Sequence, residues 1–119
     1  MTFRLPRVLD QHYTCPAGHT YPDHPIDLDD RTWSCRTCRQ PVHVTVLDRA
    51  GHRFVIERRL ARELTENDQV VYWTGVGLTA GAVLCSQLPR GKATGWYLAV
   101  EGCRGEPIEP GQYIARRIS

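Results

Sequence analysis

Two short segments, Cys15-Pro-Ala-Gly-His19 and Cys35-Arg-Thr-Cys38, decide how the first third of this chain folds. Fifteen residues separate them, and together they supply three thiols and one imidazole. A C-x-x-C pair lies on a tight turn that directs both sulfurs toward one point, and Gly18 gives the first segment the backbone freedom that its turn needs. Four such ligands satisfy a tetrahedral zinc ion and leave no open position. The spacing predicts a structural zinc site, with the ligands Cys15, His19, Cys35 and Cys38.

The surroundings of these ligands also favour a metal. Residues 1–41 contain few apolar side chains and show no regular hydrophobic period. Because such a segment has little core of its own, ion binding would supply its folding free energy. His19 has the best spacing for the fourth ligand, but His12 and His24 are close enough to replace it. No βαβ pattern follows the C-x-x-C pair, which disfavours a redox site.

Beyond residue 41 the sequence is typical of short strands. Valines alternate with polar residues from 42 to 46, a turn ends at Gly51, and apolar residues return at 54–56, which predicts a hairpin. Residues 57–64 predict two turns of helix. From Thr65 onward turns separate five predicted short strands, a pattern that favours a small closed barrel. These strands include 69–73, 78–85 and 113–118, and the clearest of them is 96–100.

Composition limits the class of protein. The chain has 119 residues, of which 41% are hydrophobic and 24% charged, as in a soluble globular protein and unlike a disordered or fibrous one. Its 15 basic and 13 acidic residues leave a net charge of +2, a smaller excess than phosphate-binding proteins usually carry. We see no apolar run long enough for a signal peptide or a membrane span. We therefore expect a cytoplasmic protein with reduced thiols and no membrane partner.

The cysteine and histidine arrangement resembles the zinc-ribbon and treble-clef knuckle pairs of many small bacterial proteins. The resemblance covers residues 13–58, and a ribbon is favoured because the segment after Cys38 predicts a hairpin rather than a helix. Members of this large group bind DNA, RNA or proteins. The resemblance therefore implies a zinc ion and a scaffold, and it does not imply an activity.

Residues 64–118 are similar to a Src-homology-3-like barrel, an architecture that Tudor-type domains share. The similarity rests on the segments at 64–70, 96–100 and 110–114. It implies a shallow groove that would bind a proline-rich peptide, lined by Trp96, Pro110 and Tyr113. The alternative is that these side chains fill the core of the barrel. The predicted fold is mostly β, with a zinc ribbon at 1–60 packed on a five-stranded barrel at 61–119.

These features favour a non-enzymatic adaptor that zinc stabilises and that binds a protein partner through the barrel surface. The alternative is a nucleic-acid-binding accessory or regulatory protein, whose phosphate contacts would be Arg36, Arg39, Arg58, Arg59 and Arg62. Those arginines could equally form a solvated surface. An enzyme would need an open metal position, so we expect no catalytic residue and no small-molecule substrate. Cys85 and Cys103 lack a local base and are predicted to be inert buried thiols.

Overall fold

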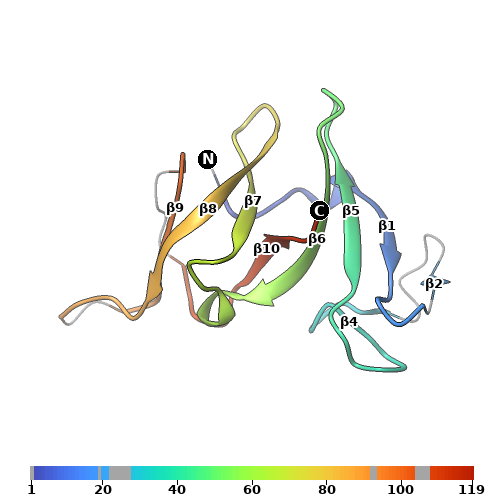
Figure 1. Ribbon diagram of the computed structural model, residues 1–119, viewed down its shortest axis with the longest axis horizontal. Helices are drawn as coiled ribbons and strands as arrows, with labels where there is room; N and C mark the ends of the chain where they lie inside the picture. The colour runs from blue at the N-terminus through green and yellow to red at the C-terminus, as the bar shows by residue number, and fades with distance from the viewer. Residues whose placement is uncertain (1, 19, 22–27, 92–93, 104–107) are drawn as a thin grey trace.

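A computed structural model describes residues 2–18, 20–21, 28–91, 94–103 and 108–119 of the chain (Figure 1). The elements of the first half are η1 (Arg7–Leu9), β1 (Asp10–Thr14), β2 (Thr20–Tyr21), β3 (Leu28–Asp29), β4 (Ser34–Cys35), β5 (His43–Leu47) and β6 (Arg53–Leu60). The elements of the second half are η3 (Ala61–Glu63), β7 (Gln69–Trp73), β8 (Leu78–Gln87), β9 (Tyr97–Val100) and β10 (Tyr113–Arg117). None of the helices among the described residues is long and apolar enough to cross a membrane.

Eight of the described strands form one antiparallel sheet in the order β2-β1-β5-β6-β10-β7-β8-β9, and β3 pairs with β4 in a separate hairpin. The last strand, β10, lies between β6 and β7 (Figure 1). Tyr113 pairs with Leu60 of β6, and Arg116 pairs with both Glu57 of β6 and Val70 of β7. Strands on both sides of residue 60 therefore belong to the same sheet. The division into domains at that residue stays a prediction.

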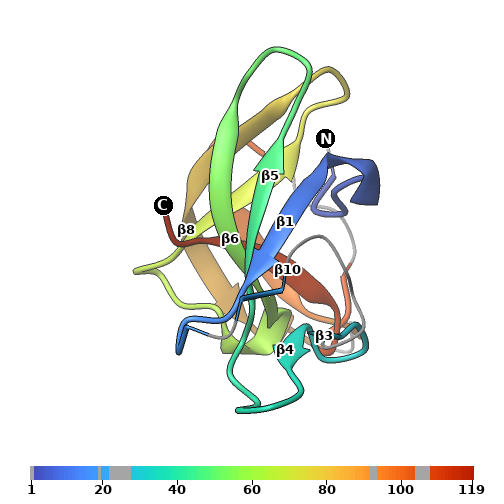
Figure 2. The ribbon, with the colours of Figure 1, turned by 90° about the vertical axis from the view of Figure 1, so that its right-hand side faces the viewer.

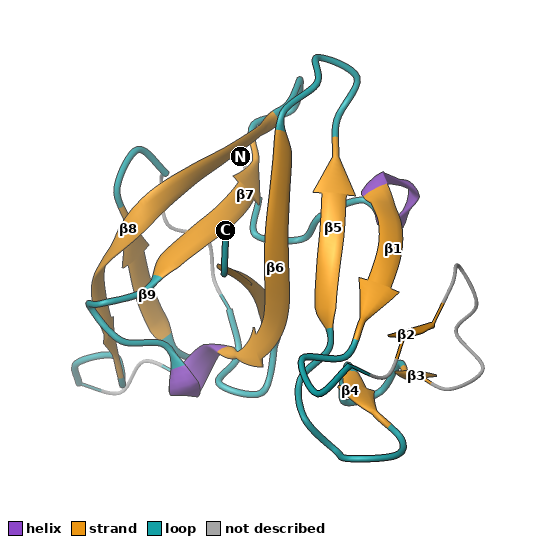
Figure 3. Ribbon diagram, turned by 45° about the vertical axis from the view of Figure 1, so that its right-hand side comes forward, coloured by secondary structure: helices purple, strands orange, loops and turns teal. Residues whose placement is uncertain are grey.

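The closed five-stranded Src-homology-3-like barrel predicted for 61–119 is wrong. The outer strands of the described sheet, β2 and β9, do not pair with each other, so the sheet is curved but open (Figures 1 and 3). The reason is the position of β10, which pairs along its whole length with β6 of the N-terminal hairpin. The last strand therefore joins the two halves of the chain instead of closing the second half on itself.

Local strand signals in the sequence are confirmed at several places. β7 spans the residues predicted for it, and β5 and β6 form the predicted hairpin. The helix predicted at 57–64 is wrong, because β6 continues to Leu60 and only the 3₁₀ turn η3 follows it. Residues 57–60 are extended because all four pair with β10, and Glu57 also pairs with β5. Such tertiary pairing overrides a short helical pattern.

The core consists of two clusters of buried side chains along the sheet. The first lies around β5 and includes Val44, Val46 and Ile56, which are fully buried. The second lies under β7, β8 and β9 and includes Val70 and Phe3. Phe3 reaches the second cluster because the N-terminal segment crosses the molecule between β7, where Thr2 pairs with Trp73, and β1 (Figure 1). Figure 2 shows the molecule from the side on which this segment enters β1. The N-terminal segment therefore links β1 to β7.

A buried carboxylate connects two turns at one end of the sheet. Asp48 follows β5, and its Oδ2 accepts hydrogen bonds from the backbone N–H of Leu78 at 2.8 Å and from His52 Nδ1 at 2.7 Å. Its Oδ1 accepts the backbone N–H of His52 at 2.9 Å. The bond from Leu78 is the main cause that lowers the pKa of Asp48 to about 2, and His52 lowers it further, whereas burial opposes the shift. The ionised carboxylate thus stabilises the turn after β5 and the start of β8.

We expect Asp48→Asn to lower the melting temperature at neutral pH and to flatten the acid dependence of stability. The pKa of Asp48 is lower in the folded protein than in the unfolded protein. Its ionised carboxylate therefore makes its full contribution to the free energy of unfolding above about pH 4, the unfolded pKa. That contribution is lost as the pH falls through about 2. Thermal unfolding at several pH values measures this effect. The control is Asp30→Asn, at an exposed carboxyl in a turn. Identical acid profiles for wild type and Asp48→Asn would contradict the assignment.

Substitution of Gly81 by alanine is expected to destabilise the protein by about 1–3 kcal/mol, the usual cost of overpacking. A Cβ atom at this position of β8 would lie 2.2 Å from the backbone oxygen of Glu101, which cannot move without disturbing β9. Denaturant unfolding measures the loss. Thr79→Ala, on the same strand and partly exposed, serves as the control and should change stability by less than about 0.5 kcal/mol.

Candidate metal centre

Tight turns place the three cysteines. Cys15 directly follows β1, and its backbone oxygen accepts the N–H of Gly18 at 3.0 Å. Gly18 has a φ of 91°, a left-handed conformation that glycine adopts without strain. Cys35 lies in β4, and its backbone oxygen accepts the N–H of Arg39 at 2.7 Å across the C-x-x-C turn. Arg39 has a φ of 62°, so this second turn holds a left-handed residue that is not glycine.

These turns bring the three thiols together. The sulfurs of Cys15, Cys35 and Cys38 all lie within 4.8 Å of one another. Cys15 Sγ and Cys38 Sγ are 3.3 Å apart, which is too far for a disulfide bond of about 2.05 Å. Four ligands at about 2.3 Å from a tetrahedral zinc ion would be separated by about 3.8 Å. The cluster therefore has the spacing of a metal site, and it could hold a metal ion.

Burial and charge make the cluster better suited to a cation than to free thiols. Cys15 and Cys35 are buried and Cys38 is half-buried. The backbone N–H of Gln40 lowers the pKa of Cys38, but the Cys15 thiol, burial and the Cys35 thiol together raise it above its usual value. Three thiolates so close together would repel one another, whereas a bound cation stabilises the deprotonated form of each. The donor set is soft, as thiophilic metals prefer.

Three histidines are the candidates for the fourth metal ligand. His19 and His24 lie outside the described residues. His12 lies in β1, and its Nε2 is 3.1 Å from the hydroxyl oxygen of Thr45. Its imidazole is not among the described groups that converge with the three sulfurs. The assignment of His19 stays a prediction.

The arginines predicted to contact nucleic acid do not form a continuous free surface. Three of them bind carboxylates within the chain: Arg58 binds Asp10 at 2.9 Å, Arg59 binds Glu57 at 3.2 Å, and Arg39 is 3.5 Å from Asp29. Arg36 and Arg62 are exposed and form no ion pair with another described residue. Arg58 is buried, although it lies in a charged segment of the sequence that is typical of an exposed surface.

The aromatic residues of the predicted groove lie in different surroundings. Trp96 packs against the second core cluster, and its Nε1 donates a hydrogen bond to the Ser86 hydroxyl at 3.0 Å. Tyr113 lines a cavity beside Trp33 to which Trp96 does not contribute. The backbone oxygen of Pro110 accepts the N–H of Arg62 at 3.2 Å. Whether Trp96, Pro110 and Tyr113 bind a partner stays a prediction.

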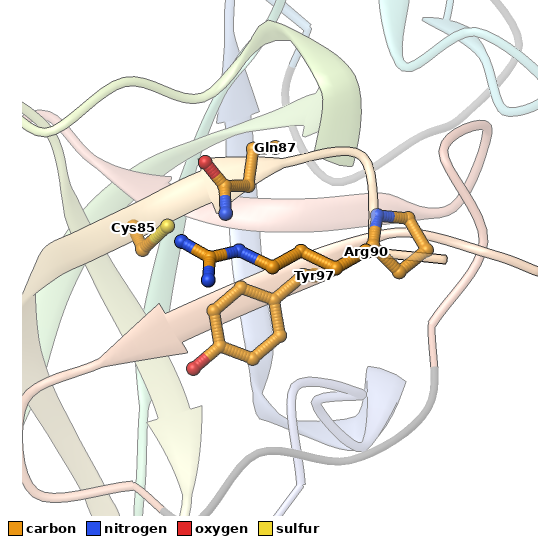
Figure 4. Close-up of a pocket in the computed structure, with 5 residues that line it drawn as sticks. Cys85, Gln87, Arg90 and Tyr97 are labelled. Atoms are coloured by element: carbon orange, nitrogen blue, oxygen red, sulfur yellow. The ribbon is translucent and has the colours of Figure 1, made fainter. Parts of the chain in front are cut away.

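Tyr97 is an exposed aromatic residue that the sequence analysis did not select. Half of its surface is accessible, and it lines a hollow of about 590 Å³ with Cys85, Gln87, Pro89 and Arg90. Figure 4 shows Arg90 extending across this hollow toward Cys85, with the ring of Tyr97 alongside. Strand alternation could have identified Tyr97 from the sequence. Trp96 and Tyr97 are neighbours, and the side chains of neighbouring strand residues point in opposite directions, so a buried Trp96 implies an exposed Tyr97.

Comparison of the chain with models of protein families, with curated proteins and with solved structures finds no match. The observed features are a β-rich fold and a cluster of three cysteines that could bind a metal.

We expect the purified protein to bind one equivalent of a thiophilic divalent ion. Loading with Co²⁺ should produce a thiolate charge-transfer band, because sulfurs would coordinate the ion directly. Cys15→Ser should weaken metal affinity by at least about tenfold, since it removes one of the soft donors. The matched control is Cys85→Ser, which removes a thiol outside the cluster and should leave affinity unchanged. Absence of stoichiometric metal in the wild type, together with no response to added ion, would contradict the site.

Proposed function

We propose that this chain is a non-enzymatic adaptor, stabilised by a structural zinc ion, that binds a segment of a protein partner at the hollow between β8 and β9. The observation that carries the proposal is the exposed ring of Tyr97 in that hollow, with the exposed Leu84 and Leu88 next in sequence to residues that line it. The partner segment would present an apolar side chain to Tyr97 and a carboxylate to Arg90.

Zinc is the ion that best fits the donor set. Three thiolates and an imidazole from His19 would form a closed tetrahedral shell, which leaves no position for a substrate. The polar segment around the cysteines would then depend on the ion for its stability. This arrangement supports a structural role and supports the expectation that the protein is not an enzyme. His43, the nearest histidine after Cys38, is paired in β5 and offers a control for His19.

Three of the six exposed large apolar side chains of the described residues lie in β8, in β9 or between them. Leu84 is 58% exposed, Leu88 is 70% exposed and Tyr97 is 50% exposed. The pairing of β8 with β9 shifts register between Val83 and Cys85, so Leu84 lies at a β-bulge, a device that redirects side chains. Exposed apolar side chains that gather beside a polar group are characteristic of protein interaction sites. Arg90 supplies the polar group, since no described carboxylate lies within ion-pair distance of it.

A nucleic-acid partner is supported less well. Backbone phosphates need several free cations in a row, and three of the five candidate arginines already bind carboxylates. The alternative has a separate test, because binding to DNA or RNA must weaken steeply as salt rises. Tight, salt-sensitive binding to either polymer would replace the protein-partner proposal.

We expect Tyr97→Ser to abolish specific partner recovery. The experiment compares immobilised wild-type protein with immobilised Tyr97→Ser and Val76→Ser. Mass spectrometry quantifies the proteins that each of them retains. Val76 is 90% exposed in the turn between β7 and β8, outside the residues that line the hollow, so its replacement controls for a general loss of surface apolarity. A partner should be recovered equally by wild type and Val76→Ser and at least about tenfold less by Tyr97→Ser, as for an interface hot spot.

The recovered partner would then be purified and titrated by calorimetry. Arg90→Gln, which removes the positive charge of Arg90, should weaken the binding if the partner supplies a carboxylate. Equal affinity of wild type and Tyr97→Ser for that partner would contradict the proposed surface. Melting curves of each variant exclude unfolding as the cause of lost binding.

A further inference from the structure

Cys15 and Cys38 bring two separate chain segments into contact through their sulfurs. Cys15 follows β1, and Cys38 lies 23 residues later in the C-x-x-C turn. Their Sγ atoms are 3.3 Å apart, which is closer than the about 3.8 Å between two sulfurs that share a tetrahedral zinc ion. An approach of about 1.25 Å would bring them to the length of a disulfide bond. The two thiols are therefore placed for a covalent bond with each other as well as for a shared ion.

The three thiols of the cluster differ in their access to solvent. Cys38 is half-buried, whereas Cys15 is 5% exposed and Cys35 is fully buried. An oxidant dissolved in water therefore meets Cys38 first. An accessible cysteine beside a second thiol that can resolve its oxidised form is the arrangement of redox-sensor cysteines.

Cys35 is a poorer partner for Cys38 because backbone hydrogen bonds hold its turn in place. Its N–H donates to the oxygen of Gln40 at 2.9 Å, and its oxygen accepts the N–H of Arg39 at 2.7 Å. These bonds set the separation of the two sulfurs within the C-x-x-C turn, whereas Cys15 can approach through a movement of one segment relative to the other. The pair of Cys15 and Cys38 thus differs from the C-x-x-C pair, whose sequence context disfavours a redox site.

We propose that Cys15 and Cys38 form a redox pair that hydrogen peroxide oxidises to a disulfide, and that this disulfide and the metal ion exclude each other. In the first step the Cys38 thiolate attacks one peroxide oxygen, the O–O bond breaks and hydroxide leaves, so Cys38 becomes a sulfenic acid. In the second step the Cys15 thiolate attacks the Cys38 sulfur, the S–S bond forms, the S–O bond breaks and a second hydroxide leaves. The two sulfurs lose two electrons in total, and the peroxide gains them. The two hydroxide ions take up the protons that the thiols released and become water.

The disulfide withdraws two of the three described sulfur donors of the metal site. The donors that remain, Cys35 and one histidine, would bind a thiophilic ion much less tightly than the complete set. The new bond keeps the end of β1 attached to the C-x-x-C turn, so a covalent cross-link replaces the ion between the same two segments. Formation of the disulfide rests on the geometry of the thiols, whereas its exclusion of the metal rests on the proposed zinc site.

The test begins with the reduced protein at about pH 8.5, where an ordinary cysteine is half ionised. A chelator removes any metal, hydrogen peroxide is added, and the remaining thiols are blocked before digestion with trypsin. Trypsin cleaves the chain between the three cysteines, which fall in the separate peptides 8–31, 32–36 and 37–39. We expect the cross-link between peptides 8–31 and 37–39 to exceed the two other pairings at least about tenfold, and a dithiol reductant to reverse it.

The second arm repeats the oxidation with protein that carries one equivalent of Zn²⁺. Zinc should slow the cross-linking at least about tenfold, because it binds the same thiolates that attack the peroxide. A colorimetric zinc indicator should record one ion released for each disulfide formed. A Cys15–Cys38 bond in a protein that never retains metal would contradict the zinc site and support the redox pair. Zinc that stays bound to the disulfide form would overturn the exclusion.

Single substitutions identify the two sulfurs. Cys35→Ser should retain the Cys15–Cys38 disulfide. Cys15→Ser removes the resolving thiol and should lower the yield of disulfide at Cys38 at least about tenfold, with sulfinic acid in its place. Cys85→Ser, outside the cluster, should behave as the wild type.

The peptide map of the wild type decides the proposal even if a variant does not fold. A main product that links Cys35 to Cys38 would overturn it. Oxidation of Cys38 to sulfinic acid without a cross-link in the wild type would overturn it as well.

Discussion

The pairing of β10 with β6 on one side and β7 on the other is the constraint on which the rest of the structure depends. Without that strand, the hairpin that follows the cysteines and the hairpins that follow residue 64 would have no common backbone ladder. With it, β1, which leads into the cysteine cluster, and β8 and β9, which border the exposed hollow, belong to one curved sheet. Ion pairs reinforce the junction, because Arg116 of β10 contacts both Glu57 of β6 and Asp68 beside β7.

The cysteine end of the molecule joins two features that the sequence does not connect. The turn before β4 contains Trp33, whose φ of 51° is unusual for a bulky residue, and two residues later Cys35 enters the thiol cluster. Trp33 also stacks near Tyr13 and covers Arg58. A metal that fixes the second cysteine turn would therefore hold the ring of Trp33 against Arg58 as well as stabilise a polar segment.

Local signals in the sequence were sufficient for local structure. The spacing of Cys15, Cys35 and Cys38 predicted the cluster, and β-branched or aromatic runs bounded by turns predicted strands such as β7. The errors share one cause, which is pairing between distant segments. Residues 57–60 became extended because β10 pairs with them, and Arg58 became buried because Asp10 and Trp33 close over it. No pattern within one segment contains that information.

The central place of β10 also has a consequence for synthesis of the protein. Leu60 and Tyr113 are cross-strand partners, so β6 cannot complete its second ladder until residues 113–117 have left the ribosome. Until then the facing edges of β6 and β7 are unsatisfied templates to which other extended chains can add. Folding through such long-range contacts is slow compared with helix formation. During that interval the nascent chain would be a substrate for chaperones that bind unpaired strands.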